Sequence, residues 1–511
     1  MDRKVEFTNL INAGYACNGD SIILGGAILD GEPVAGTQVK ISLKTMNRHG
    51  LVAGATGTGK TKTLQVISEQ LSEKGVPVLV MDVKGDLSGI AMPGEAKPFI
   101  LERHSKIDLP YSVKGYPVEL LSLSEQEGVR LRATVSEFGP VLLSRILDLN
   151  DTQAGVLAVI FKYCDDNKLA LLDLKDLKKV IQYVTEEGKE EIEKDYGRIS
   201  TATTGIITRK ILELEQQGAD LFFGELSFDI KDLLRKDRNG NGYISIIRLT
   251  DIQDKPKLFS TFMLSLLAEI YSQMPEKGDA EKPELVIFID EAHLIFSQAS
   301  KTLLEQIENI VKLIRSKGIG VFFVTQNPTD VPNGVLAQLG LKVQHALRAF
   351  TAVDRKAIKL TAENYPDSDY YKTDETITSL GIGEALVTAL NERGIPTPLA
   401  AVMLRAPQSR MDILTPSEIS SINRSSDLVR KYSSAIDRES AYEILGEKIA
   451  KLGEEEAKKQ ERKEWDSGRW GERERYPKRR TSVSGRQNPV VKVLTSATFI
   501  RGVLGVLKKV L

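Results

Sequence analysis

The chain of 511 residues contains few of the residues that build metal sites or disulfide frameworks. It has four histidines and two cysteines, Cys17 and Cys164, which lie far apart without a metal-ligand neighbour. We interpret the cysteines as ordinary thiols in a reducing compartment. No run reaches the roughly 18 apolar residues that a membrane span needs, and the first residues lack the apolar core of a signal peptide. We therefore expect a cytoplasmic protein with no membrane span.

An excess of positive charge is also missing, since the formal net charge is −1. A protein that binds nucleic acid over its whole surface is strongly basic, so any DNA contact here must come from local patches. The hydrophobic content of 41% is enough for a large core. At this length we expect two to four structural units.

The most informative motif present is a phosphate-binding loop of the form G-x-x-x-x-G-K-T, which follows the short apolar stretch 51–53. Its residues are Gly54, Ala55, Thr56, Gly57, Thr58, Gly59, Lys60 and Thr61, and Thr63 lies one turn into the following helix. The glycines let backbone N–H groups point at phosphate oxygens, and the helix adds its positive end. We expect Lys60 to reach the β- and γ-phosphates and the Thr61 hydroxyl to bind Mg²⁺. The motif predicts ATP as the bound nucleotide.

A second motif provides the carboxylates that such a loop requires. Five apolar residues, 285–289, precede Asp290 and Glu291, which is typical of a buried parallel strand with acids at its carboxyl end. We predict that Asp290 holds the hydration shell of Mg²⁺ and that Glu291 orients or deprotonates the attacking water. A carboxylate placed for water favours an ATPase over a kinase.

Two further strands end in polar residues. Strand 320–324 leads to Gln326, whose amide we predict to sense the γ-phosphate or the attacking water; a simple strand-end hydrogen bond is the alternative. Strand 76–81 leads to Asp82, which faces the same edge of the sheet. Lys84 follows it and could contact phosphate, a neighbouring group or only solvent.

Two other motif matches fit poorly. Residues 290–293 read Asp-Glu-Ala-His, as in two-domain RNA helicases, but the only Ser-Ala-Thr element lies at 496–498. Residues 237–245 match the start of a calcium-binding loop, but position twelve is Arg248 where such loops have glutamate. We interpret residues 237–245 as a polar turn that leads into a strand.

Several motifs together resemble a known family. They are residues 47–51, 82–89, 315–318, 324–328, 344–350 and 437–445, together with the phosphate loop and the acidic strand. The combination is similar to the helicase HerA-like ATPases of the bacterial YjgR group, within the HerA/FtsK superfamily, over roughly residues 46 to 447.

The resemblance implies a RecA-like core that assembles into a ring, usually a hexamer, with ATP between subunits and DNA in the central channel. In such rings an arginine from the neighbouring subunit stabilises the charge of the transition state. The residues that match the motifs are Arg315 and Arg348, with Arg355 as a third candidate. A surface salt bridge is an equally good interpretation of each.

We predict an α/β fold with a RecA-like P-loop NTPase core, a mostly parallel sheet, a helical insertion and a flexible C-terminal tail. The predicted segments are a small β-rich extension (1–45), the first part of the core (46–115), a mainly helical insertion (116–235), the second part of the core (236–405), a C-terminal helical segment (406–450) and a charged tail that ends in an amphipathic helix (451–511). Apolar residues at helical spacing over 141–163, 174–185 and 200–217 indicate the insertion. It either packs on its own core or holds a partner.

The function predicted from these features is Mg²⁺-dependent ATP hydrolysis by a HerA/FtsK-type ring motor that translocates on or remodels DNA. The alternative is a nucleotide-dependent assembly or switch protein that acts on a protein partner without moving DNA. No nuclease motif stands out, so DNA cleavage would require a separate partner.

Overall fold

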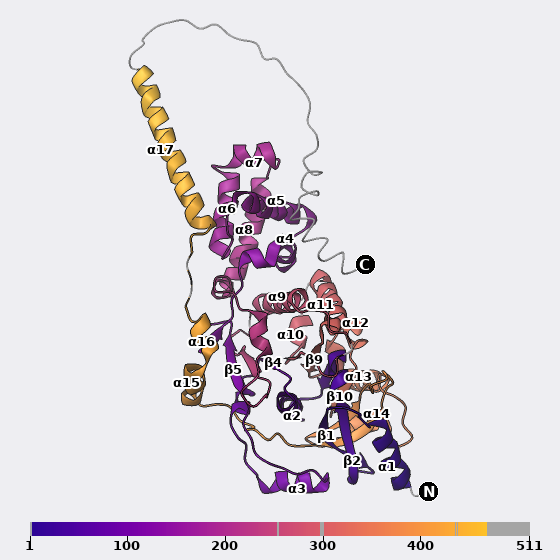
Figure 1. Cartoon of the computed structure of the whole chain (residues 1–511). Coiled ribbons are helices and arrows are strands. Elements are labelled where there is room, and N and C mark those ends of the chain that lie inside the picture. The colour runs from indigo at the N-terminus through magenta and orange to yellow at the C-terminus, as the bar shows by residue number, and fades with distance from the viewer. Residues whose placement is uncertain are drawn as a thin grey trace. The chain divides into compact units, whose positions relative to one another are not determined.

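The computed structural model describes residues 3–467, apart from 253–254, 279, 297–300, 435 and 437. The chain divides into two compact units (Figure 1). Unit 1 comprises residues 1–131 and 228–434, and unit 2 comprises 132–227 and the chain from 435 onward. None of the helices in the described part of the chain is long and apolar enough to cross a membrane.

Unit 1 is built on one sheet, which has twelve strands in the described residues, in the order β2-β1-β12-β11-β10-β3-β9-β8-β4-β7-β5-β6. The strands are β1 (Ser21–Leu29), β2 (Glu32–Ser42), β3 (Gly50–Ala53), β4 (Val78–Asp82), β5 (Val118–Ser122), β6 (Val129–Arg130), β7 (Ile244–Arg248), β8 (Leu285–Ile289), β9 (Ile319–Thr325), β10 (Leu341–His345), β11 (Glu384–Thr388) and β12 (Ala400–Leu404). From β10 to β6 all neighbours are parallel, and from β10 to β2 all are antiparallel. The predicted α/β class with a mostly parallel sheet is confirmed.

The central strands are buried on both faces, as their unbroken apolar runs predicted. Phe288 and Phe322 lie in the same core cluster as Leu64 and Ile67 of helix α2. The neighbouring Phe323 points to the opposite face, where the centroid of its ring lies 5.5 Å from that of Phe296 at the end of α10, with the two rings tilted. Helices therefore cover both faces of the sheet, which leaves the strand ends as the accessible edges.

The helices of unit 1 fall between and after these strands. They are α1 (Arg3–Gly14), α2 (Lys60–Glu73), α3 (Pro98–Lys106), α9 (Pro256–Gln273), α10 (His293–Phe296), α11 (Lys301–Ile314), α12 (Asn333–Leu336), α13 (Ala352–Ala362), α14 (Thr373–Ser379), α15 (Pro416–Ser425) and α16 (Asp427–Tyr432). The first 45 residues, predicted as a separate extension, form α1 and two strands that lengthen the same sheet.

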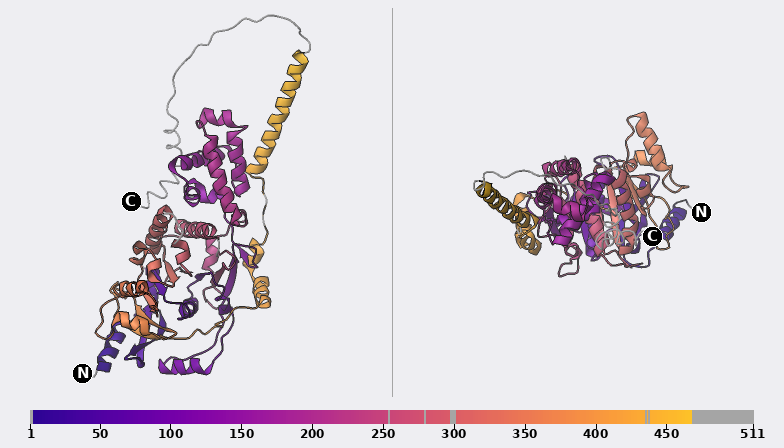
Figure 2. Two further views of the ribbon diagram at one scale, coloured as in Figure 1. Left: turned by 180° about the vertical axis from the view of Figure 1, so that it is seen from behind. Right: turned by 90° about the horizontal axis from the view of Figure 1, so that it is seen from above.

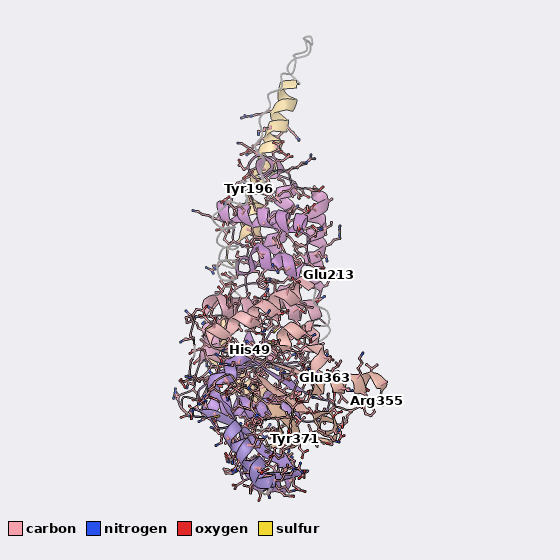
Figure 3. All side chains as sticks on the ribbon, turned by 90° about the vertical axis from the view of Figure 1, so that its right-hand side faces the viewer. His49, Tyr196, Glu213, Arg355, Glu363 and Tyr371 are labelled. Atoms are coloured by element: carbon pink, nitrogen blue, oxygen red, sulfur yellow. The ribbon has the colours of Figure 1, made fainter. Side chains whose placement is uncertain are left out.

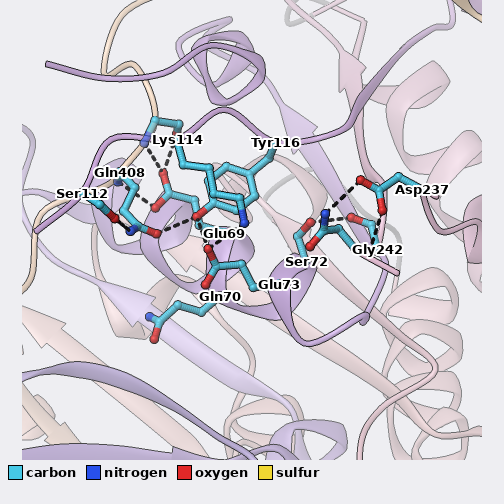
Figure 4. A network of polar contacts seen from close by, with 12 residues as sticks. Glu69, Gln70, Ser72, Glu73, Ser112, Lys114, Tyr116, Asp237, Gly242 and Gln408 are labelled. Carbon is cyan, nitrogen blue, oxygen red and sulfur yellow. Dashed lines mark hydrogen bonds and ion pairs between the residues drawn. The ribbon is translucent and has the colours of Figure 1, made fainter. Parts of the chain in front are cut away.

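Helix α2, which follows the phosphate loop, is held in place by polar contacts at its far end (Figure 4). Buried Glu69 accepts hydrogen bonds from the backbone N–H groups of Gln408 (2.9 Å) and Ser409 (3.0 Å). Ser72 donates to the carbonyl of Gly242 at 2.6 Å. A buried carboxylate that lacks such donors would be costly, so these contacts bind α2 firmly to two distant segments of the chain. The N-terminus of α2 is thereby fixed at the edge of the sheet.

Unit 2 is helical in its described residues. It contains α4 (Val135–Ile146), α5 (Asp151–Asn167), α6 (Leu174–Thr185), α7 (Lys189–Asp195), α8 (Thr201–Gln216) and α17 (Ala441–Ser467). The helical periodicity noted in the sequence coincides with α5, α6 and α8. The unit begins at residue 132 and not at 116, because β5 and β6 belong to the sheet of unit 1.

Helix α17 extends into the segment that we predicted as a flexible charged tail from residue 451 onward. It is one continuous rod through Ser467 (Figures 1 and 2). Asp176 accepts a hydrogen bond from the backbone of Tyr442 at 2.9 Å and so caps its first turn. Beyond that turn, pairs such as Lys451 with Glu447 follow the i,i+4 spacing that supports an exposed helix. The predicted amphipathic helix within 490–511 lies outside the described residues.

A buried histidine fastens the strand that precedes the phosphate loop. His49 accepts a hydrogen bond from the Val321 backbone at Nδ1 (3.0 Å), and its Nε2 lies 2.7 Å from the Val311 carbonyl. This pattern needs a neutral ring with the proton on Nε2. Burial lowers the pKa of His49 to about 4.

Acidification should therefore destabilise the fold through His49. Its folded pKa lies below the unfolded value, so this stability is present above about pH 6.5 and is lost as the pH falls toward 4. We expect the loss of thermal stability between pH 7.5 and 5 to be smaller in His49→Asn than in the unmodified chain. An equal loss in both proteins would show that another group governs the acid response.

Candidate nucleotide site

The candidate site lies at the carboxyl edge of three adjacent parallel strands, β3, β9 and β8. The loop 54–59 follows β3, Gln326 follows β9, and Asp290 with Glu291 follows β8. Since β9 pairs with both of the others, the three ends are brought to one place although they are far apart in sequence. Ligands of open α/β sheets bind outside such carboxyl ends.

The loop takes its shape from glycines in backbone conformations that other residues rarely adopt. Gly54, Gly57 and Gly59 have φ values of 152°, 78° and 112°. The backbone N–H of Gly54 donates to Thr325 at 3.2 Å and that of Ala55 donates to Ala346 at 2.8 Å. The loop is thus tied to β9 and to the chain after β10.

Gly54 should tolerate no side chain. A Cβ there would lie 2.5 Å from the Cβ of His345, whereas a Cβ at Gly57 would meet nothing within 4 Å. We expect Gly54→Ala to lower the free energy of unfolding by more than about 2 kcal/mol and to abolish nucleotide binding. Gly57→Ala, which suffers only from its positive φ, should lose roughly 1–2 kcal/mol. Equal melting temperatures for the two variants in thermal unfolding would contradict this close approach.

Lys60, the first residue of α2, turns its ammonium group back into the loop. Its Nζ donates to the carbonyls of Gly54 (2.7 Å) and Ala55 (3.2 Å), and the residue is buried. Burial and then the nearby Lys84 lower the pKa of Lys60. A buried ammonium group whose hydrogen bonds go to neutral carbonyls is suited to take a polyanion as a further partner.

Asp290 is buried at the end of β8, and its Oδ2 has no hydrogen-bond partner among the described residues. Burial and then the neighbouring Glu291 raise the pKa of Asp290 to about 7. A buried carboxylate oxygen without a partner fits a hard cation such as Mg²⁺, which would satisfy it. Thr61, half-buried at the second residue of α2, supplies a hydroxyl of the type that such an ion binds.

Glu291 is buried and has a left-handed backbone, with φ at 47°. Its Oε1 forms an ion pair with Lys84, and its Oε2 lies 3.1 Å from Nδ1 of His293. A non-glycine residue at positive φ is strained and is concentrated at functional sites. Lys84, for which we considered phosphate, a neighbouring group or solvent, thus pairs with a carboxylate of its own chain, and His293 approaches the same carboxylate.

Gln326 is exposed beside the loop, and its Oε1 lies 3.5 Å from the hydroxyl of Thr56. The sheet order thus places this amide between the loop and the acidic strand. Thr58 contributes its hydroxyl to the Ala55 carbonyl (2.7 Å) and its own carbonyl to the Gly383 backbone N–H (3.0 Å). Thr58, which we predicted to contact the nucleotide, therefore helps to fix the conformation of the loop.

His345 is a site residue that sequence reasoning missed as such. Its Nε2 lies 2.8 Å from the Thr63 hydroxyl, and its side chain packs against Gly54 and near Gly59. Burial and then Lys60 lower the pKa of His345 to about 4, so the ring is neutral. His345 therefore supports the loop through its contacts with Gly54, Gly59 and Thr63. The signals in the sequence were its position after an apolar stretch and its membership of the motif 344–350.

The candidate arginines are exposed. Arg315 begins the short 3₁₀ turn η5 (Arg315–Lys317) after α11, and Arg348 donates to the Thr378 carbonyl at 3.2 Å. Arg355, on α13, is also exposed (Figure 3). The structure brings together the loop, Asp290, Glu291 and Gln326, and it leaves these arginines facing solvent.

Comparison with known families now identifies the chain. The model of the helicase HerA-like C-terminal family matches residues 28–510. The chain belongs to this family. The resemblance noted in the sequence is thereby confirmed at the level of HerA.

Individual relatives are distant. The DNA double-strand break repair helicase HerA of Sulfolobus acidocaldarius is 22% identical over 353 residues, which cover 68% of this chain and 64% of that protein. The HerA of Saccharolobus solfataricus is 22% identical over 355 residues, with 68% and 63% covered. The chain thus spans less than two thirds of the length of these HerA proteins.

Among solved structures, the bacterial conjugative coupling protein TrwB in complex with sulphate is similar, with a TM-score of 0.53 and 15% identity. The match covers 80% of this chain and 94% of that one. The likeness shows that the P-loop ATPase fold is shared.

Proposed function

We propose that the chain hydrolyses ATP with Mg²⁺ at the site formed by loop 54–61, Asp290 and Glu291. The observation that carries this proposal is the convergence of three groups at adjoining strand ends: a buried ammonium group, a buried carboxylate oxygen without a partner, and a second buried carboxylate. Together they match the needs of phosphoryl transfer to water, in which positioning and charge stabilisation dominate.

Each group has a separate task in this proposal. The backbone N–H groups of the loop and the Lys60 ammonium bind the phosphates, and the helix dipole of α2 adds to their field. Asp290 and Thr61 would hold Mg²⁺, which when bound neutralises phosphate charge. Glu291 accepts a proton from the attacking water, and Gln326 orients that water. His345 keeps the loop in shape.

The proposal extends to a ring, a hexamer, that acts on DNA in the cytoplasm. The exposed Arg315 and Arg348 are free to reach the nucleotide of a neighbouring subunit, and the relatives include proteins named as DNA repair helicases. An arginine supplied in trans is worth about 10³–10⁵ in turnover in other NTPases. A nuclease partner would supply any cleavage.

A second candidate is a switch that acts on a protein partner. Residues 132–227 of unit 2 carry 17 acidic and 12 basic side chains. The net acidic charge of residues 132–227 repels the phosphate backbone, so this helical segment favours a protein partner over DNA. Both functions can coexist in one molecule, with DNA held by unit 1.

Displacement of a third strand from a DNA triplex separates the two candidates. A translocating motor displaces the oligonucleotide with ATP, but not with a non-hydrolysable analogue and not in Glu291→Gln. Displacement that depends on hydrolysis would support the motor. ATP turnover without any displacement would favour the switch.

A further inference from the structure

The proposed mechanism does not use the ion pair between Lys84 and Glu291. Lys84 lies in the loop after β4, and its side chain is 39% exposed, whereas that of Glu291 is 6% exposed. The lysine thus reaches a buried carboxylate from the solvent side. The other carboxylate oxygen already has His293 as its partner at 3.1 Å.

The loop that carries Lys84 is held rigidly. Asp82 accepts hydrogen bonds from three successive backbone N–H groups, those of Gly85 (2.7 Å), Asp86 (3.2 Å) and Leu87 (3.1 Å). Gly85 has a φ of 79°, and a Cβ there would lie 2.7 Å from Thr250. The backbone at Lys84 is therefore fixed, and only the side chain can change its partner.

We propose that Lys84 is a positioning residue that restrains Glu291, holding it in a paired resting state from which a phosphate oxyanion releases it. This inference rests on the proposed role of Glu291 as the base. While Lys84 is paired, one carboxylate oxygen lies at ion-pair distance from its ammonium group. A carboxylate paired with a cation is a poorer acceptor for a proton from water. Withdrawal of Lys84 frees one oxygen toward the attacking water.

A phosphate oxyanion suits this release because Lys84 is partly exposed and Lys60, buried in the loop, already serves the nucleotide. An ammonium group is a flexible point charge that exchanges one anion for another without a fixed geometry. The oxyanion comes either from the nucleotide itself or from the backbone of DNA. The ion pair would thus keep ATP hydrolysis slow until a phosphate oxyanion displaces Lys84.

The test compares Lys84→Met with the unmodified chain in steady-state ATP hydrolysis, with and without duplex DNA. We expect kcat without DNA to rise about three- to ten-fold while KM for ATP stays within about two-fold, a shift of about 0.6–1.4 kcal/mol in the barrier. Lys84→Arg, which keeps the cation, should restore low turnover. If DNA stimulates the unmodified chain but adds little to Lys84→Met, DNA phosphate is the natural release. If DNA stimulates both proteins by the same factor, the release does not come from DNA, and the nucleotide phosphate, which then displaces Lys84 only in part, is its source.

Two outcomes would overturn the restraint. A fall in kcat in Lys84→Met would indicate that Lys84 binds phosphate during turnover. An unchanged kcat would show that the ion pair does not limit hydrolysis. A double variant with Glu291→Gln gives the control, because Lys84→Met should have no effect once the base is gone. If the unmodified chain hydrolysed no ATP, the proposed ATPase function itself would be wrong. This result differs from both outcomes above, in which the unmodified chain is active.

Discussion

Replacing Glu291 with glutamine leaves ATP binding intact and lowers hydrolysis by at least about 10²-fold, the range typical of general-base catalysis. Glutamine keeps the size of the side chain but cannot take a proton from water. Glu291 is buried next to Asp290, just after the end of β8, and its left-handed backbone departs from the extended conformation of that strand. Binding of a fluorescent ATP analogue and steady-state phosphate release measure the two effects separately.

The matched control for this variant is His293→Ala, which removes a partner of Glu291 without removing the carboxylate. It should lower turnover far less than Glu291→Gln. Phosphate release by Glu291→Gln at the rate of the unmodified protein would show that another group activates the water.

Replacing Lys60 with alanine should abolish turnover and weaken ATP binding by at least about 10²-fold. Lys60 is the buried cation that lies within the loop, 2.7 Å from the Gly54 carbonyl. Its removal takes away a charge-assisted contact to the phosphates from a buried position, where such contacts are strongest. Equilibrium binding and hydrolysis together measure the loss.

Lys62 offers the matched control, since it lies two residues later on the same helix and donates to the Met411 carbonyl at 2.7 Å. Lys62→Ala should retain ATP binding and turnover. Tight ATP binding by Lys60→Ala would contradict the assignment of the loop, and equal loss in both variants would indicate damage to α2 as a whole.

The residues of the candidate site at the carboxyl edge of the sheet could be predicted from the sequence, because each belongs to a short motif next to a strand. Asp290 and Gln326 directly follow apolar strands, Lys60 follows one through the loop 54–59, and parallel strands end at a common edge. The structure adds the order of the strands: β9 lies between β3 and β8, and this order brings the three residues together.

The contacts of His345 and Lys84 could not be predicted, since they depend on which strands become neighbours. His345 meets Thr63 only because β10 pairs with β3, and Lys84 meets Glu291 only because β4 pairs with β8. Likewise, β1 joins the sheet through pairing near Leu404. Contacts of high sequence separation leave no periodic signal.

The extent of α17 was missed for a different reason. Its mixed charges read as a solvated linker, because high charge and low hydrophobicity are shared by disordered segments and by exposed helices with i,i+4 pairs. The anchor that decides between them, Asp176 at its first turn, lies far away in the sequence.

Steady-state ATP hydrolysis by the purified chain, with and without duplex DNA and with Glu291→Gln as the blank, tests the central claim most directly. Our account predicts Mg²⁺-dependent turnover that is lost in Glu291→Gln and stimulated several-fold by DNA. Turnover that DNA leaves unchanged would move the function to a protein partner, and the absence of turnover above the Glu291→Gln blank would contradict the account.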